Sequence, residues 1–118
     1  MNRPNGSPSK WSIVQASKWI RFLVKSGMVE FDSGGHAHGR GSERGVSNAE
    51  MLKVLELGRP LRKEPAFVVC PGGGFEEERV TFEHEFRSRP DLAIGVVAGV
   101  SDANQNCVIV TCWTKKTR

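Results

Sequence analysis

The sequence predicts an α+β fold in which two N-terminal helices pack on a four-stranded antiparallel meander sheet. Apolar residues recur at helical spacings before Pro65, alternate with polar residues after it, and the alternating segments are separated by short turn-forming stretches. At 118 residues the chain has the length of one ordinary domain. We expect residues 1–10 to form a disordered arm, residues 11–113 a single domain, and residues 114–118 a basic tail.

Two helices are predicted in the first half of the chain. The first spans Trp11 to Ser26, and its apolar residues at spacings of three and four are Ile13, Ala16, Ile20, Leu23 and Val24. Ser47 and Glu50 have the spacing of a capping box, in which the serine accepts from the third amide and the glutamate reaches back to the cap. The second helix therefore begins there and stops near Gly58 and Pro60.

The predicted strands follow Pro65, apart from one short segment. Met28 to Phe31 alternates briefly and is interpreted as a short strand or a connector. The four strands of the meander are Ala66 to Cys70, Arg79 to Phe86, Leu92 to Val100 and Asn106 to Trp113. Each connection is short and rich in glycine, proline, aspartate or asparagine, which is typical of hairpins and slightly longer loops.

Composition favours a cytoplasmic protein without a cofactor or a metal. No apolar run approaches the roughly 20 residues of a membrane span, and the first ten residues lack a signal-peptide core. Cys70, Cys107 and Cys112 are too few for a disulfide framework. Because Cys107 and Cys112 are five positions apart, a regular strand would point them to opposite faces, so we expect buried apolar roles.

Positive charge is concentrated in the N-terminal half. Residues 1–63 carry eleven Lys and Arg against five Asp and Glu, whereas residues 64–118 carry six against eight. A positive face of this kind would attract a polyanion such as nucleic acid. The basic residues Lys18, Arg21 and Lys25 recur at helical spacing and are either a solvated face or an extension of an RNA path.

The basic half contains a run with the composition of a phosphate site. We call residues 36–44 the His/Arg run, since it holds His36, His38, Arg40 and Arg44. A ribonuclease without a metal needs a base for the 2′-OH, a cation for the phosphoryl oxygens and an acid for the leaving 5′-oxygen. Histidine and arginine can supply all three, which makes the run a candidate catalytic site.

The residues of the run leave its conformation and role open. In a helix, His36, Arg40 and Arg44 would lie along one face, but Gly39 and Gly41 each disfavour a helix by about 1 kcal/mol relative to alanine. A glycine-rich surface loop with solvated charges is the alternative. A zinc site at His36 and His38 is a weaker hypothesis, because no second pair completes four ligands.

His84 is the remaining candidate in the predicted sheet. It shares one strand face with Val80, Phe82 and Phe86. A partly buried histidine bonded to backbone is favoured over a site role, although the acid and base chemistry of imidazole keeps His84 among the candidates.

The run and its surroundings resemble a known family. The pattern H-A-x-x-R-x-x-x-R-G-V-S, starting at His36, precedes a capped helix ending in Leu-Gly and a last strand containing Val-Ile-Val-Thr. This resembles the domain-of-unknown-function family 4258, which is commonly grouped with the barnase, EndoU, colicin and RelE ribonuclease fold. The resemblance implies an α+β fold and a metal-independent ribonuclease, with His36 as general base or acid, Arg40 and Arg44 as phosphate clamps, and Thr111 as a positioning group.

The sequence supports two functional hypotheses. The first is a bacterial endoribonuclease-like domain of toxin or mobile-element type, which cuts RNA by 2′-OH attack to give a 2′,3′-cyclic phosphate. RNA and an antidote or other protein are its candidate partners. The second is a non-catalytic module that binds RNA or a protein on the same fold. A nuclease needs His36, an arginine and a second group, His84 or Thr111, around one cleft.

Overall fold

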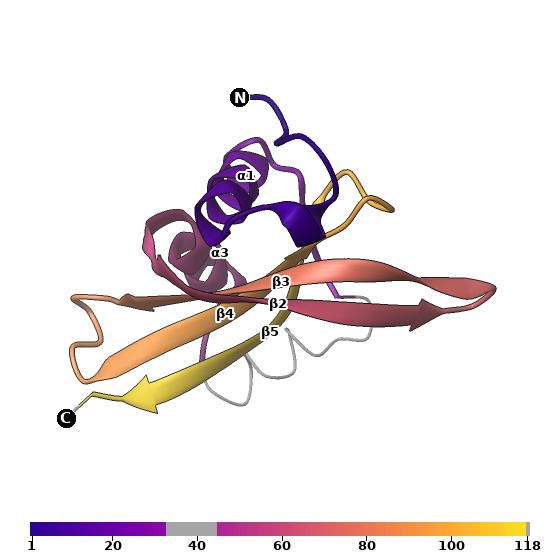
Figure 1. Ribbon diagram of the computed structural model, residues 1–118. Coiled ribbons are helices and arrows are strands. Elements are labelled where there is room, and N and C mark those ends of the chain that lie inside the picture. Colours follow the sequence, from indigo (N-terminus) through magenta and orange to yellow (C-terminus); the bar gives the residue numbers. More distant parts are fainter. Residues whose placement is uncertain (33–44, 118) are drawn as a thin grey trace.

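The computed structural model describes residues 1–32 and 45–117 and has an α+β architecture. Its elements, in chain order, are η1 (Pro8–Lys10), α1 (Ile13–Lys25), β1 (Val29–Phe31), α3 (Asn48–Leu57), β2 (Arg59–Cys70), β3 (Gly73–Glu85), β4 (Leu92–Val100) and β5 (Cys107–Lys116). Figure 1 shows both α-helices on the same face of the sheet. No helix within these ranges is long and apolar enough to cross a membrane.

The sheet differs from the predicted four-stranded antiparallel meander. The described strands form one five-stranded mixed sheet in the order β1-β5-β4-β3-β2, with β1 parallel to β5 and every other pair antiparallel. β1 has only three residues and lies beside β5, far away along the sequence. Local alternation carries no information about a pairing of this kind, so the sequence indicated Met28 to Phe31 as a short strand or a connector but did not place it in the sheet.

The strand boundaries agree with the prediction where a strand is apolar and differ where it is charged or rich in glycine and proline. β4 spans Leu92–Val100 as predicted. β2 begins at Arg59 rather than Ala66, and β3 begins at Gly73 rather than Arg79. The residues by which β2 and β3 exceed the prediction are mainly charged residues, glycines and prolines, which show no apolar alternation. They are in strand conformation because β2 and β3 pair along this length.

Both helices begin at a capping box. In α1, Ser12 Oγ accepts from the Gln15 amide at 3.1 Å, and Gln15 Oε1 accepts from the Ser12 amide at 2.9 Å. In α3, the Ser47 and Glu50 bonds measure 3.1 and 3.0 Å, which confirms the predicted start of this helix.

The hydrophobic core lies between the helices and one face of the sheet, which we call the helix face. Because paired residues share a face and neighbours alternate, the two faces can be followed through the register. The core residues of the helix face include Val80, Phe82, Ile94, Val96, Ala98 and Ile109, all fully buried. From the helices, Ile20, Leu23, Met51 and Leu55 pack against them. We call the other side of the sheet the opposite face.

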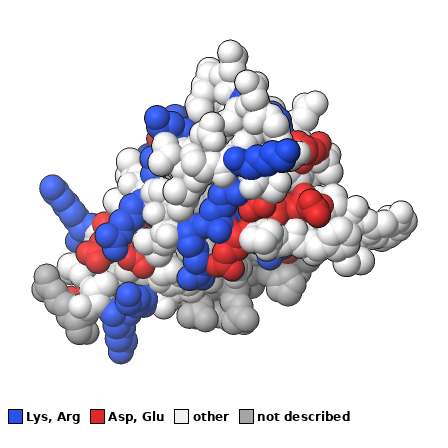
Figure 2. All heavy atoms as spheres, in the orientation of Figure 1, with Lys and Arg blue, Asp and Glu red and all other residues white. Residues whose placement is uncertain are grey.

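On the face of the molecule shown in Figure 2, the described Lys and Arg side chains are interspersed with Asp and Glu. Arg21, one of the predicted basic helix residues, donates to the carbonyls of Leu55 and Gly58 and lies 5.7 Å from the centre of the Phe82 ring. Its charge therefore stabilises the C-terminal end of α3, where helix carbonyls lack intrahelical donors.

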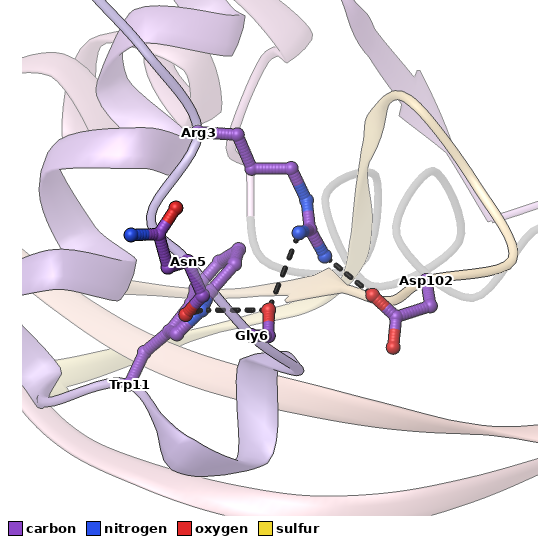
Figure 3. A network of polar contacts seen from close by, with 5 residues as sticks. All are labelled: Arg3, Asn5, Gly6, Trp11 and Asp102. Atoms are coloured by element: carbon purple, nitrogen blue, oxygen red, sulfur yellow. Dashed lines mark hydrogen bonds and ion pairs between the residues drawn. The ribbon is translucent and has the colours of Figure 1, made fainter.

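The first ten residues, expected to be a disordered arm, contact the domain. Trp11 is buried, and its indole N–H donates to the carbonyls of Asn5 and Gly6 at 3.1 and 3.2 Å. The Arg3 guanidinium lies 4.8 Å from the centre of the Trp11 ring and pairs with Asp102 (Figure 3). At the other end, β5 includes Lys115 and Lys116 of the expected basic tail.

Candidate functional site

The His/Arg run, with the predicted site residues His36, Arg40 and Arg44, lies outside the described residues. What the structure places is the residue on each side of this stretch. Before it, the Asp32 amide donates to the Ile109 carbonyl of β5 at 2.9 Å. After it, the Gly45 carbonyl accepts from Arg89 Nη1 at 2.8 Å. Both flanks of the stretch are thus bonded to the sheet or to its loops.

The residues that follow the run, from Gly45 to Ser47, lead directly into the N-terminal cap of α3. Gly45 has a φ of +67°, which favours glycine over any residue with a Cβ. Arg89 Nη1 lies 3.3 Å from Glu50 Oε2, so one guanidinium links Glu50 to Gly45. The hydrogen bond from the Ser47 amide holds the pKa of Glu50 below its usual 4.5, against the opposing effect of burial, and Arg89 lowers it further. Glu50 is therefore ionised at neutral pH.

Thr111 lies on the opposite face of the sheet. It pairs with Val97, which in turn pairs with Thr81. The register shifts between Val97 and Ala98, because Ala98 pairs with Ile109 and leaves Val110 as an extra residue of β5. This bulge turns Thr111 away from the core face that Ile109 occupies.

The same bulge corrects an expectation about two cysteines. Cys107 and Cys112 are both buried, as expected, but they lie on the same face of β5 and not on the opposite faces of a regular strand. Cys112 pairs with Val96 of the core, and the extra residue changes the alternation between the two thiols. Within the described ranges, no group of three or more His, Cys, Asp and Glu side chains is placed to hold a metal ion.

His84 lies on the helix face. It pairs with Ile94, a fully buried core residue, and its ring meets Phe86 edge-on at 4.7 Å between centroids. His84 is half-buried, as the sequence indicated, and its ring packs against the aromatic ring of Phe86. Because His84 and Thr111 lie on opposite faces of one sheet, they do not share a cleft.

The opposite face carries a groove that sequence reasoning missed. It has a volume of about 550 Å³, and Phe75, Val108 and Val110 supply apolar walls. Its charged lining is mainly acidic, with Glu30, Asp32 and Glu77 against Arg79. Arg79 is the only cation among the described residues that line the groove, and its Nε is paired with Glu77 Oε1 at 2.9 Å. Phe75, Glu77 and Arg79 are at alternate positions, which is the pattern of residues that share one face of a strand. The consecutive glutamates 76–78 are not typical of a strand, so the prediction began this strand only at Arg79.

Thr111 and the groove lie near the start of the undescribed stretch. Asp32 and Val110 both line the groove, and Asp32 is bonded to Ile109, two residues before Thr111. Of the five predicted site residues, the structure describes His84 and Thr111 and places them on opposite faces of the sheet. Thr111 is the nearer of the two to Asp32, the last described residue before the run. Comparisons of the chain with family models, with curated proteins and with solved structures found no match.

Proposed function

We propose that this chain is a metal-independent endoribonuclease-like domain of toxin or mobile-element type, with the His/Arg run and Thr111 as its working residues. One observation carries the proposal. The last described residue before residues 33–44, Asp32, is bonded to β5 two residues before Thr111. The chain therefore enters the histidine- and arginine-rich stretch beside a strand whose threonine faces away from the core.

The proposed chemistry is attack of the ribose 2′-oxygen on phosphorus, which expels the 5′-oxygen and leaves a 2′,3′-cyclic phosphate. His36 takes the 2′-OH proton, and Arg40 and Arg44 stabilise the charge on the phosphoryl oxygens. The Thr111 hydroxyl positions the phosphate or the ribose by a hydrogen bond. His84 is left out because it lies on the helix face, so the proton for the 5′-oxygen comes from the run or from water.

A non-catalytic RNA-binding module is the second candidate, and one arrangement favours it. Trp113 and Lys115 follow Thr111 at alternate positions of β5 and therefore share its face. The Trp113 indole lies on Gly95, since a Cβ added there would be 2.0 Å from the ring. An indole beside a lysine on a sheet is the combination that stacks bases and neutralises phosphates.

The test is incubation of the full chain with single-stranded and structured RNA in the presence of a chelator. We expect cleavage that leaves cyclic phosphate ends and falls about 100-fold or more in His36→Ala, the usual range for loss of a general acid or base. Thr111→Val should lower the rate about tenfold or more, whereas His84→Gln should leave it unchanged. Cleavage that persists in His36→Ala would refute the proposal. Salt-sensitive RNA retention without cleavage, weakened by Trp113→Ala, would favour the binding module.

A further inference from the structure

The second half of β2 is an exposed, uncharged sheet edge. β2 is the last strand of the sheet, and the β2–β3 hairpin extends beyond the rest of the molecule in Figure 1. We call Ala66–Cys70 the edge segment; it carries no charge and has a proline on each side, Pro65 and Pro71. Its side chains of Phe67 and Val69 are 65% and 80% exposed. Natural proteins normally protect such an edge with charges or prolines.

The first half of β2 has that protection, whereas the edge segment does not. Arg62, Lys63 and Glu64 lie in the first half, and Arg62 is ion-paired with Glu64. In the edge segment, the Phe67 ring lies against Gly74 of β3, where an added Cβ would be 2.7 Å from the ring. The ring therefore has one side on the hairpin and leaves most of its surface to solvent.

Pro65 indicates which backbone groups of the edge segment face outward. A proline within a strand is tolerated where its nitrogen points away from the ladder, so Pro65 directs its nitrogen to the edge rather than to β3. Alternate residues of an antiparallel strand direct their N–H and C=O to the same side. Phe67 and Val69 therefore offer their N–H and C=O groups at the edge, while Ala66, Val68 and Cys70 bond to β3.

We propose that the edge segment pairs antiparallel with the same segment of a second copy of this chain, with the two-fold axis at Val68. In this register Phe67 faces Val69 of the other copy, and each pair exchanges two backbone hydrogen bonds. Phe67 and Val69 lie on one face of the joined sheet, Ala66 faces Cys70 on the other, and Pro65 faces Pro71 at each end. Prolines cannot extend the ladder, so the pairing ends where the uncharged segment ends.

The charges and the size of the edge segment select a second copy and set its affinity. The edge segment is uncharged, so two copies bring no like charges opposite each other. Because both copies have a proline at each end of the same five residues, the two segments match in length. A five-residue ladder is only about 17 Å long and buries far less than the roughly 800 Å² per partner of a standard interface. The dimer is therefore weak and depends on protein concentration. This inference is independent of the proposed ribonuclease.

A cross-linking experiment on the full chain tests both the partner and the register. In Ala66→Cys, the new thiol would face Cys70 of the other copy at about 4.5 Å between Cα atoms, within the range of a disulfide. Within one chain, residues 66 and 70 are about 13 Å apart along the strand, so they cannot join. We expect oxidised Ala66→Cys to give a dimer whose mapped disulfide joins residues 66 and 70 of different chains.

Three matched variants decide the outcome. Glu64→Cys has the same number of thiols, but its new thiol faces Gly72 and should cross-link at least tenfold more slowly. Ala66→Cys combined with Cys70→Ser should form no disulfide-linked dimer, because residue 66 faces residue 70 of the other copy and not its residue 66. Adding Val69→Lys, at a position 80% exposed, should suppress cross-linking with little effect on folding. Equal rates for the Ala66→Cys and Glu64→Cys variants, a mapped 66–66 or 70–70 bond, or cross-linking unaffected by Val69→Lys would overturn the proposal.

Discussion

Glu50→Gln should destabilise the protein at neutral pH and have no effect in acid. The glutamine keeps an oxygen for the Ser47 amide but removes a charge at the N-terminus of α3 and the ion pair with Arg89. A carboxylate in the first turn of a helix contributes about 0.3–1 kcal/mol, and an exposed ion pair about 0.2–1 kcal/mol. The sum predicts a loss of about 1 kcal/mol at pH 7, or roughly 3–5 °C in Tm for a chain of this length.

The pH dependence gives the sign of the effect. Hydrogen bonding by the Ser47 amide and the charge of Arg89 lower the pKa of Glu50 in the folded state from 4.5. A lowered pKa means that the stabilisation is fully present above the unfolded pKa and is lost as pH falls through the folded pKa. The difference in unfolding free energy between wild type and Glu50→Gln should therefore shrink toward zero as the pH falls below 4.5.

The other capping box of the chain is a matched control. Ser12 and Gln15 make the same pair of bonds at nearly the same distances, but Gln15 carries no charge. Gln15→Glu should gain about 0.3–1 kcal/mol at pH 7 and nothing in acid. The assay is urea unfolding of wild type, Glu50→Gln and Gln15→Glu from pH 7 down to the onset of acid unfolding. A loss in Glu50→Gln that is equal at pH 7 and pH 3 would show that the charge of Glu50 does not stabilise the helix.

Two further predictions concern the core and its thiols. Gly58→Ala should lower the free energy of unfolding by about 1–3 kcal/mol or more, as measured by urea unfolding. The reason is that the new Cβ would lie 2.5 Å from the backbone oxygen of Val54 and 2.7 Å from that of Glu83. An unchanged unfolding midpoint would contradict this packing. Of the three thiols, Cys70 should react at once with a thiol reagent, whereas the two buried thiols should react only on unfolding, since burial raises the pKa of Cys107 to about 12. Counting labelled thiols before and after denaturation checks this, and rapid labelling of all three in the folded state would be inconsistent with it.

Local features of the fold were predictable because they depend on neighbours in the sequence. The capping box at Ser47 fixed the start of α3, since its hydrogen bonds join residues three apart. The apolar run of β4 was predicted with the observed bounds, Leu92–Val100. Edge strand β2 was predicted only in its apolar half, because charged residues and prolines give no alternation there.

The candidate site was predictable in composition but not in arrangement. The sequence named Thr111 and His84 together, yet the register places them on opposite faces of the sheet. His36, Arg40 and Arg44 lie outside the described residues, so the site roles predicted for them stay predictions.

The sequence by itself determined the α+β class, the caps of α3 and which segments are apolar enough to be buried. The tertiary structure decided the parallel pairing of β1 with β5 and the bulge at Val110. Side chains of a strand alternate with a period of two, so a single extra residue exchanges the faces of everything after it. Such an insertion is visible only against the partner strand. For that reason the face on which Thr111 lies could be read from the assembled sheet and not from the chain alone.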